Sequence, residues 1–249
     1  MGKADLHAHT CQDGWGDGNQ RVADLLAFVE QHTDLDLFAV TDHDSTIAAR
    51  AAWELHQSGS YRFELLPGVE VTNQAGHLLC YFPHGEIFDI PSLRPFWWTV
   101  RYARERGAIC IPAHAVYAPW LATTIRRGLQ YGEELDGIEA VNAGIGDAAR
   151  ERLLHLAQDF SDRVALVGNS DAHDQAAVGA AYTAFPGNTA SDFLYALRER
   201  QTEPVYVRRP QLSARARRFT TRRSMTRPGW AGNLWREYIG RAVHLRRER

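Results

Sequence analysis

The stretch KADLHAH, residues 3–9, carries two histidines separated by a single residue. Successive side chains in a β-strand point to opposite faces, so His7 and His9 share one face if this stretch is a strand. A run rich in glycine and aspartate follows directly, at residues 10–19, and places the two imidazoles at the C-terminal end of the strand. Such a pair can bind a divalent metal from one side, although an isolated His-x-His pair also occurs at solvated strand ends.

Length and composition are those of a globular protein with room for one large α/β barrel or two small domains. The chain has 249 residues, of which 45% are hydrophobic and 23% are charged. No apolar run approaches the roughly 20 residues needed to cross a bilayer. The N-terminus lacks an apolar signal region, so we expect a cytoplasmic protein. The three cysteines, Cys11, Cys80 and Cys110, do not make a disulfide framework and agree with a reducing compartment.

Positive charge is concentrated at the end of the sequence. Residues 208–249 contain 13 arginines against two acids, Glu237 and Glu248, whereas the whole chain has a formal net charge of −2. We therefore divide the chain into an acidic domain at residues 1–207 and a basic C-terminal extension at residues 208–249. The arginines and interleaved aromatic residues of this extension can serve a nucleic acid or another anionic surface, such as that of a membrane.

Strands alternate with helices along most of the chain. Apolar runs predict strands at residues 3–9, 35–40, 63–71, 77–82, 108–112, 135–141 and 164–167. The strands at 63–71 and 77–82 are close enough in sequence to pair through a turn at residues 73–76. Helical spacing predicts helices at residues 22–33, 46–56, 91–106, 148–160 and 191–200. This alternation indicates an α/β fold, either a seven-stranded (β/α)7 barrel of the TIM-barrel type or an open, doubly wound sheet.

Metal-ligating side chains recur at the C-terminal ends of these predicted strands. They are His7, His9, His43, Glu70, His114, Asp171 and His173. The C-terminal strand ends of a barrel converge on one face, where active sites lie, so this placement favours the barrel over the open sheet. Imidazole and carboxylate ligands without thiolate suit Mn, Zn, Fe or Mg. Their number implies two or three divalent ions, and closely spaced ions of this kind commonly serve phosphoester cleavage.

Five short motifs together resemble those of a known family. They are DLHAHT at residues 5–10, TDHD at 41–44, PGVE at 67–70, PAH at 112–114 and NSDAH at 169–173. In this order they look like the successive motifs of the PHP (polymerase and histidinol phosphatase) family. The resemblance implies a distorted seven-stranded barrel, a trinuclear metal centre and phosphoester hydrolysis. It also implies metal ligands at one acid in the loop after the first strand and at His7, His9, His43, Glu70, His77, His114, Asp171 and His173.

The acid in the loop after the first strand is the ligand that the motifs leave open. The family usually has Asp-Gly five residues after the second histidine, where this chain has Gly14 between two candidate acids. Asp17 lies at the better distance from the following helix and is our choice, with Asp13 as the alternative.

The expected chemistry is an in-line attack on phosphorus by a hydroxide that bridges two ions. We expect His43, His173 or a metal-bound water to protonate the leaving group. Glu139 either lines the site or is a strand residue that faces the surrounding helices. Arg126 and Arg127 either bind a second phosphate of the substrate or belong to a solvated helix face.

Other functions fit parts of this pattern. An amidohydrolase-type barrel also opens with His-x-His, but its version with a carboxylated lysine is excluded because Lys3, before the first strand, is the only lysine. A metal-binding but inactive module, with the basic extension as the working part, conflicts with the nearly complete ligand set. The partner expected for an enzyme is a phosphorylated small molecule or nucleotide. Its substrate is then a small phosphomonoester, a bisphosphonucleotide or an oligonucleotide that is cleaved as by a 5′–3′ exonuclease.

Overall fold

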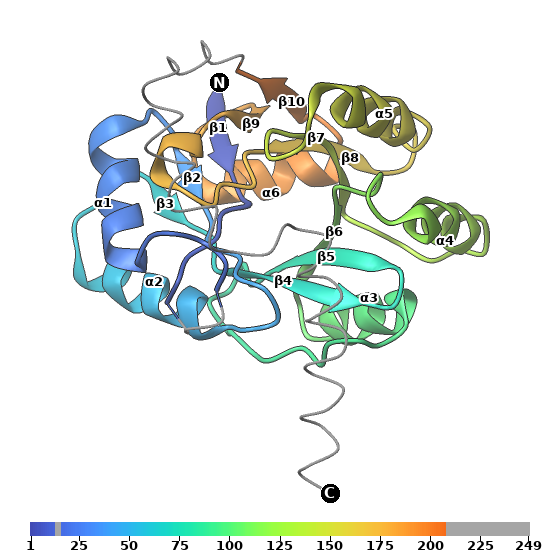
Figure 1. The fold of residues 1–249 in the computed structure, drawn as a ribbon, viewed down its shortest axis with the longest axis horizontal. Coiled ribbons are helices and arrows are strands. Elements are labelled where there is room, and N and C mark those ends of the chain that lie inside the picture. Colours follow the sequence, from blue (N-terminus) through green and yellow to red (C-terminus); the bar gives the residue numbers. More distant parts are fainter. Residues whose placement is uncertain (13–15, 208–249) are drawn as a thin grey trace, which may run out of the picture. The chain divides into compact units, whose positions relative to one another are not determined.

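The structure, a computed structural model, describes residues 1–12 and 16–207, and its strands form three sheets (Figure 1). The first has the strand order β10-β9-β1-β2-β3, with β1, β2 and β3 parallel and β9 antiparallel to both of its neighbours. Its strands are β1 (Gly2–Asp5), β2 (Leu37–Phe38), β3 (Glu64–Leu65), β9 (Ala181–Phe185) and β10 (Glu203–Tyr206). The second sheet is antiparallel and consists of β4 (Gly68–Asn73), β5 (Gly76–Tyr81) and β6 (Ile109–Ala113). The third is the parallel pair β7 (Gly137–Asn142) and β8 (Ala165–Asn169).

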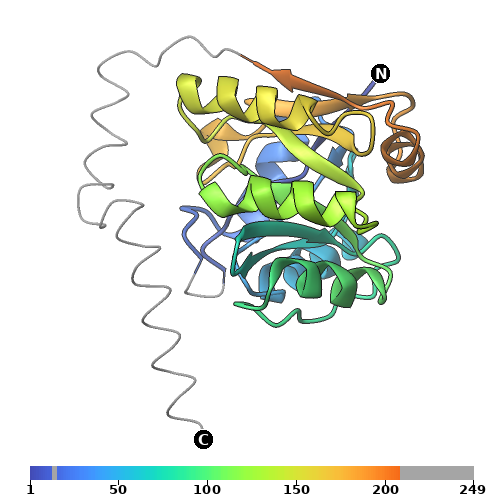
Figure 2. The same ribbon diagram turned by 90° about the vertical axis from the view of Figure 1, so that its right-hand side faces the viewer.

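Helices connect most of these strands and pack outside the sheets. They are α1 (Val22–His32), α2 (Ile47–Ser58), α3 (Phe96–Arg104), α4 (Pro119–Gln130), α5 (Asp147–Gln158) and α6 (Ala190–Arg198), with the short 3₁₀ helix η1 (Gln175–Ala177). Figure 2 shows α3, α4 and α5 side by side along one side of the sheets. Among the described residues, no helix is both long and apolar enough to cross a membrane.

The predicted distorted seven-stranded barrel is not confirmed, because the strands of the described residues form three mixed or short sheets and no closed one. Parallel neighbours need a crossover connection of about a dozen residues or more. The connection from β4 to β5 is only a tight turn at residues 73–76, as the sequence predicts, so these two strands pair antiparallel. The side-chain oxygen of Asn73 closes this turn by accepting hydrogen bonds from the backbone N–H groups of Ala75 (2.9 Å) and Gly76 (3.2 Å). The α/β class of the prediction is confirmed.

Backbone hydrogen bonds continue beyond the regular strands and draw the strand ends together. The N–H of His9 donates to the carbonyl of Ala172 (2.8 Å) and joins the segments that follow β1 and β8. The N–H of Thr41 donates to the carbonyl of Ala8 (2.9 Å) and joins the segments that follow β2 and β1. The C-terminal strand ends therefore meet on one side of the sheets, as they would in a barrel, although the ladder itself is interrupted.

The central part of the core is formed by the inner faces of β1, β2, β5, β6 and β8. Small and branched side chains fill it, among them Ala4, Leu37, Leu79, Ile111 and Val167. Helix α6 closes this layer with Phe193 and Leu197, which belong to the same buried cluster. The one large polar side chain in the layer, Tyr81, donates its hydroxyl to the carbonyl of Leu6 (2.8 Å), so that its burial leaves no donor unsatisfied.

Candidate metal centre

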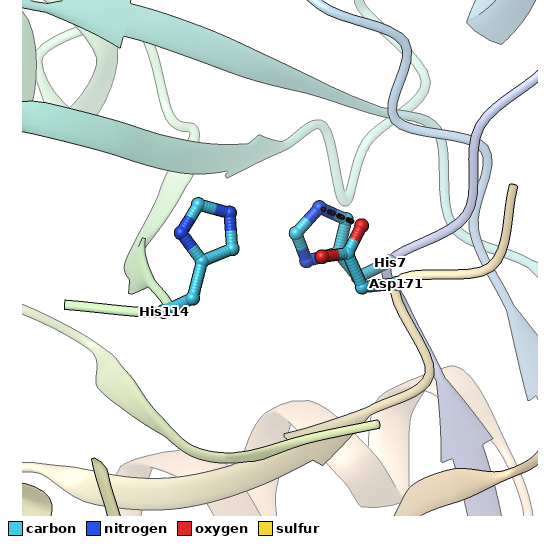
Figure 3. A group of neighbouring side chains, drawn as sticks. All are labelled: His7, His114 and Asp171. Carbon is cyan, nitrogen blue, oxygen red and sulfur yellow. Dashed lines mark ion pairs between the residues drawn. The ribbon is translucent and has the colours of Figure 1, made fainter. Parts of the chain in front are cut away.

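Nine side chains from seven segments of the chain form one cluster at the converging strand ends. Five overlapping groups of three among them have ligand atoms that all lie within 4.8 Å of one another. The members are His7 and His9 after β1, Asp17 before α1, His43 after β2, Glu70 on β4, His77 on β5, His114 after β6, and Asp171 and His173 after β8. Figure 3 shows one group, in which His7, His114 and Asp171 come from three different elements and lie around a common space. The structure thus brings together all nine of the predicted metal ligands.

The carboxylate of Glu70 lies at the centre of this cluster. Glu70 has no exposed surface, and five imidazole nitrogens lie between 2.9 and 3.4 Å from its two oxygens. Oxygen Oε1 faces His77 and His114, and oxygen Oε2 faces His7, His9 and His43. Glu70 would therefore offer both of its oxygens as ligands to metal ions held by these imidazoles.

Asp171 and Asp17 lie on the other sides of the same imidazoles. Oδ1 of Asp171 is 3.2 Å from Nε2 of His9 and 3.4 Å from Nε2 of His7. Oδ2 of Asp17 is 3.0 Å from Nε2 of His173, and its Oδ1 is 3.4 Å from Nδ1 of His9. His9 therefore has an acid beside each of its ring nitrogens.

The loop after β1 places Asp17, the acid chosen from the sequence, in the cluster with His9 and His43. Its alternative, Asp13, lies outside the described residues. Gly18 explains the Asp-Gly pair, because a Cβ at this position would lie only 2.3 Å from the carbonyl oxygen of His9. A glycine is thus needed for the loop to pass this close to the strand and present Asp17.

Two of the ligands stand on strained backbone. His114 and Asp171 have φ angles of 28° and 53°, a region that residues other than glycine rarely adopt. His114 is the first residue after β6, and Asp171 is the second residue after β8. Strain of this kind persists only where the surrounding structure enforces it, and it is concentrated at functional sites.

The supporting contacts explain how the cluster is held in place. Glu139 is fully buried; its Oε1 lies 3.1 Å from Nδ1 of His7, and its Oε2 accepts the backbone N–H of His114 (2.7 Å). The side-chain amide of Asn142 donates to Oε2 of Glu139 (2.9 Å) and to Oδ2 of Asp171 (3.1 Å). The alternative in which Glu139 faces the helices is therefore wrong.

Two further buried residues were not predicted from the sequence. Asn169 donates to Oε1 of Glu139 (3.0 Å) and accepts the N–H of Leu6 (3.0 Å), so it ties β8 to the end of β1. Asp5 accepts the backbone N–H groups of Ser170 (2.9 Å) and Gly179 (2.8 Å), and burial raises its pKa to about 6. Both lie in the short motifs of the sequence, Asp5 in the first and Asn169 in the last, and this position could have identified them as residues of the site.

Burial and neighbouring charge shift the pKa values of the imidazoles in opposite directions. Burial lowers the pKa of His43 to about 3, with a further contribution from His9 and His77. Burial also acts to lower the pKa of His9, but the carboxylates of Asp171 and Glu70 outweigh it and raise that pKa to about 10. Within one cluster, therefore, the imidazole of His43 stays neutral, whereas that of His9 readily takes up a proton.

The carboxylates of the cluster remain ionised. Burial acts to raise the pKa of Glu70 and of Asp171, yet the neighbouring imidazoles, His7 among them, hold both values well below the usual range. Burial likewise opposes ionisation of Asp17, but its hydrogen bond with His173 lowers the pKa of this acid. The site therefore concentrates buried negative charge, which needs protons on imidazoles or metal ions to balance it.

The residues present fit a divalent metal. Both ring nitrogens of His9 and Nδ1 of His43 are buried and make no hydrogen bond with any described residue, whereas buried polar atoms normally have a partner. The donors are imidazole nitrogens and carboxylate oxygens, the ligand set of Zn, Mn and Fe. Metal coordination would satisfy these nitrogens and balance the charge of the acids.

The two arginines predicted to bind substrate are not brought to the cluster. Arg126, on the exposed face of α4, pairs with Asp159 (2.9 Å) and lies over the ring of Phe160 at 5.5 Å. Arg127 is exposed on the same helix. Their position corresponds to the alternative reading, a solvated helix face.

Comparisons with known proteins agree with the motifs. Residues 155–202 match the model of a family described as PHP-associated. No curated protein matches the chain. The family model covers α6 and β8 together with the segment that carries Asp171 and His173, and so reaches part of the candidate metal centre.

Several solved structures share the fold at low sequence identity. A two-domain protein of Bacteroides vulgatus ATCC 8482, which contains a predicted PHP-like metal-dependent phosphoesterase, is 18% identical with a TM-score of 0.62 over 82% of this chain and 64% of that one. PsfC from Pseudomonas syringae PB-5123 is 19% identical with a TM-score of 0.58 over 96% of this chain and 100% of that one. The lesion-specific endonuclease PfuEndoQ from Pyrococcus furiosus is 16% identical with a TM-score of 0.54 over 79% of this chain and 56% of that one. The chain thus spans less than two thirds of the Bacteroides and Pyrococcus proteins. The resemblance to PHP proteins is supported by both the family model and the fold.

Proposed function

We propose that this chain, which has the PHP type of fold, is a metal-dependent enzyme that hydrolyses phosphoric esters and holds two or three divalent ions. The observation that carries the proposal is the group of five imidazoles around the buried carboxylate of Glu70. The PHP-like phosphoesterase in the Bacteroides protein supports the reaction class. We further propose that the enzyme is cytoplasmic and that its ions are Mn, Zn, Fe or Mg.

The nine clustered side chains would hold the ions, and the exposure of each histidine indicates its role. Bound ions would supply an activated water and neutralise charge on the phosphate oxygens. His173 is 40% exposed at its side chain, so it lies where it can donate a proton to a leaving oxygen. His43 is more deeply buried, and burial lowers its pKa, so its neutral imidazole is suited to bind a metal ion.

Substrate binding, and not only catalysis, should depend on the metal. The cluster contains the carboxylates of Asp17, Glu70 and Asp171, with Glu139 directly behind them, and these charges repel a phosphate group. Metal ions would reverse the sign of the local charge. We therefore expect the site to bind an anionic substrate only after metal ions have bound.

Hydrolysis of an aryl phosphomonoester by the full-length protein with Mn or Zn is the expected result of a first assay. The panel should also contain the matching diester, a 3′,5′-bisphosphonucleotide and a 5′-phosphorylated oligonucleotide, because the cluster does not distinguish among them. A chelator should abolish the activity, and added metal should restore it. If elemental analysis showed bound metal while none of the four substrates was hydrolysed, the proposal would be refuted.

One residue favours a nucleotide or a nucleic-acid end as the substrate. The ring of Tyr117 lies 6.0 Å from the ring of His114, and 39% of Tyr117 is exposed. The backbone N–H of Tyr117 donates to the carbonyl of His114 (3.1 Å), so a short turn holds the ring at the edge of the cluster. An exposed aromatic ring in this position can stack on a nucleobase. We therefore propose a bisphosphonucleotide phosphatase or a 5′–3′ exonuclease as the second candidate, which the Pyrococcus endonuclease supports.

Replacing Tyr117 by alanine is expected to lower kcat/KM for a nucleotide by about tenfold, because stacking on a base contributes roughly 1–3 kcal/mol. The kcat/KM for glycerol phosphate, which has no ring, should stay unchanged, and Tyr117→Phe should retain the nucleotide activity. Tyr131→Ala is a matched control, since Tyr131 is 83% exposed and follows the far end of α4. Equal losses on both substrates in Tyr117→Ala would show that the ring only supports His114.

The role of the basic extension stays a proposal, because residues 208–249 lie outside the described residues. Its 13 arginines are suited to an anionic partner such as a nucleic acid. An oligonucleotide substrate and a phosphorylated small molecule would then differ in their need for this segment.

A further inference from the structure

A cavity of about 390 Å³ opens at the strand ends opposite to the metal centre. Apolar side chains form much of its lining: Ile109, Leu135, Val164, Leu194 and Leu197. Ile109 is the first residue of β6, whose other end leads to His114 in the metal centre. Five residues of extended chain, at about 3.3 Å each, separate the two sites by roughly 15 Å.

Basic side chains surround this cavity. Its lining contains one acid, Asp136, and five basic residues, His84, Arg104, Arg163, Arg198 and Arg200. The acid is already engaged, because its Oδ1 accepts from Arg104 (2.5 Å) and its Oδ2 accepts the backbone N–H of Cys110 (2.8 Å). The other arginines therefore leave the cavity with an excess of positive charge.

Two of these arginines make no contact within the described part of the chain that would compete with a bound anion. Arg198 and Arg200 are exposed, and neither forms an ion pair or a side-chain hydrogen bond with any described residue. Arg163 donates to the carbonyl of Leu129 (2.9 Å), and within the described part of the chain it has a single ion pair, at 3.9 Å with its neighbour Asp162. Guanidinium groups arranged in this way can bind the oxygens of a phosphate.

Arg200 stands at a position where a helix normally has glycine. The N–H of Gln201 donates to the carbonyl of Ala196 (2.8 Å) and the N–H of Arg200 to that of Leu197 (3.2 Å), the two bonds of a Schellman motif at the end of α6. Arg200 is its left-handed residue, with a φ of 55°. Glycine would adopt this conformation without strain, so the arginine makes the folded state less stable than glycine would.

We propose that this cavity is a second ligand site, separate from the metal centre, which binds a small organic anion with a phosphate-like group and an apolar body. Arg198 and Arg200 bind the charged group, and the apolar lining receives the body. The volume lies within the usual range for small-molecule sites. The inference does not depend on the function proposed for the metal centre.

Phenylphosphonate is a suitable probe, because it joins a phosphate-like dianion to an apolar ring and has no ester bond to hydrolyse. Calorimetric titration of the full-length, metal-loaded protein should show binding that Arg200→Gly weakens by about tenfold, the loss expected for one hydrogen bond to a charged group. The same substitution should raise the Tm, because glycine relieves the strain. Arg198→Ala should weaken binding to a similar degree.

The control variant is Arg152→Ala, which removes an exposed arginine of α5 that does not line the cavity and should leave the affinity unchanged. Asp171→Asn, in the metal centre, should also leave this binding intact, whereas loss of all binding in that variant would overturn the proposal. A higher Tm with unchanged affinity in Arg200→Gly, together with unchanged affinity in Arg198→Ala, would overturn it as well. Inorganic phosphate should bind at least about fivefold more weakly than phenylphosphonate, since burial of an apolar group adds affinity; equal affinities would contradict a role for the apolar lining.

Discussion

Replacing Glu70 by glutamine is expected to lower kcat/KM for every phosphoester that the enzyme hydrolyses by about a thousandfold, or roughly 4 kcal/mol of transition-state stabilisation. Glutamine keeps the size of the side chain and removes its charge. Its amide group would present N–H donors to imidazole nitrogens that now face a carboxylate at 2.9–3.4 Å. Metal binding should fail for the same reason, so added Mn or Zn should not restore the rate.

Steady-state kinetics and the metal content of the same preparation measure this effect. Circular dichroism shows whether the variant is folded, which matters because Glu70 is completely buried. Glu54→Gln is the matched control, since Glu54 is exposed on α2 and outside the cluster. A Glu70→Gln protein that is folded, retains its metal and hydrolyses phosphoesters within tenfold of the wild-type rate would show that the metal centre does not depend on Glu70.

The metal-free protein is expected to lose stability as the pH rises from about 6.5 to about 10, by an amount on the order of a few kcal/mol. The pKa of His9 is raised from 6.5 to about 10 by Asp171 and Glu70, against the effect of burial. A proton that binds more tightly in the folded state stabilises it fully below the unfolded pKa, and this contribution is lost as the pH passes through the folded pKa. The lowered pKa of His43, about 3, has the opposite sign but acts only below pH 6.5.

With metal bound, the stability of the protein should rise with pH instead of falling. Metal ions displace protons from imidazoles, so the affinity for metal rises with pH, and the stabilisation by metal rises with it. Thermal unfolding at pH 6, 7.5 and 9, with chelator and with Mn, tests both slopes. His9→Gln should flatten the slope of the metal-free protein, and His155→Gln, an exposed position on α5, should not. Parallel curves with and without metal would contradict the charge balance described for the cluster.

The candidate metal ligands could be located from the sequence because their positions depend on local rules. A histidine pair with a period of two and single ligands just after apolar runs place side chains at strand ends, whatever the exact pairing of the strands. The turn at residues 73–76 was equally local, and its hairpin is present. Asp17 lies outside the short motifs and was chosen for its distance from the following helix, and the structure places it in the cluster with His9 and His43.

The pairing of the strands could not be predicted, because it depends on contacts between distant segments. The predicted strand at residues 63–71 is divided at Pro67 into β3 and β4, which belong to different sheets. Strands β9 and β10 were missed; β10 is half exposed, and its partner β9 alternates buried and partly buried residues over a short stretch. These two strands extend the first sheet beyond β1 with antiparallel pairs, which no pattern of alternating strands and helices indicates.

The contacts that hold the ligands in place could not be predicted from the sequence either. The carboxylate of Glu139 on β7 meets His7 and the backbone of His114, residues that are far from it in the chain. Only the fold shows that this acid faces the cluster. Conversely, Arg126 has the chemistry to bind phosphate, and only the fold shows that Asp159 holds it on the outside of α4.

Elemental analysis of metal bound to the purified, dialysed protein tests the central claim most directly. The cluster around Glu70 should retain two or three divalent ions per chain, since nine ligands are too many for a single ion. Glu70→Gln should retain fewer than one, and its hydrolysis should fall by the roughly thousandfold factor given above. A wild-type protein that binds no ion after incubation with Mn, Zn, Fe or Mg, or that hydrolyses phosphoesters equally well in the presence of a chelator, would contradict the account.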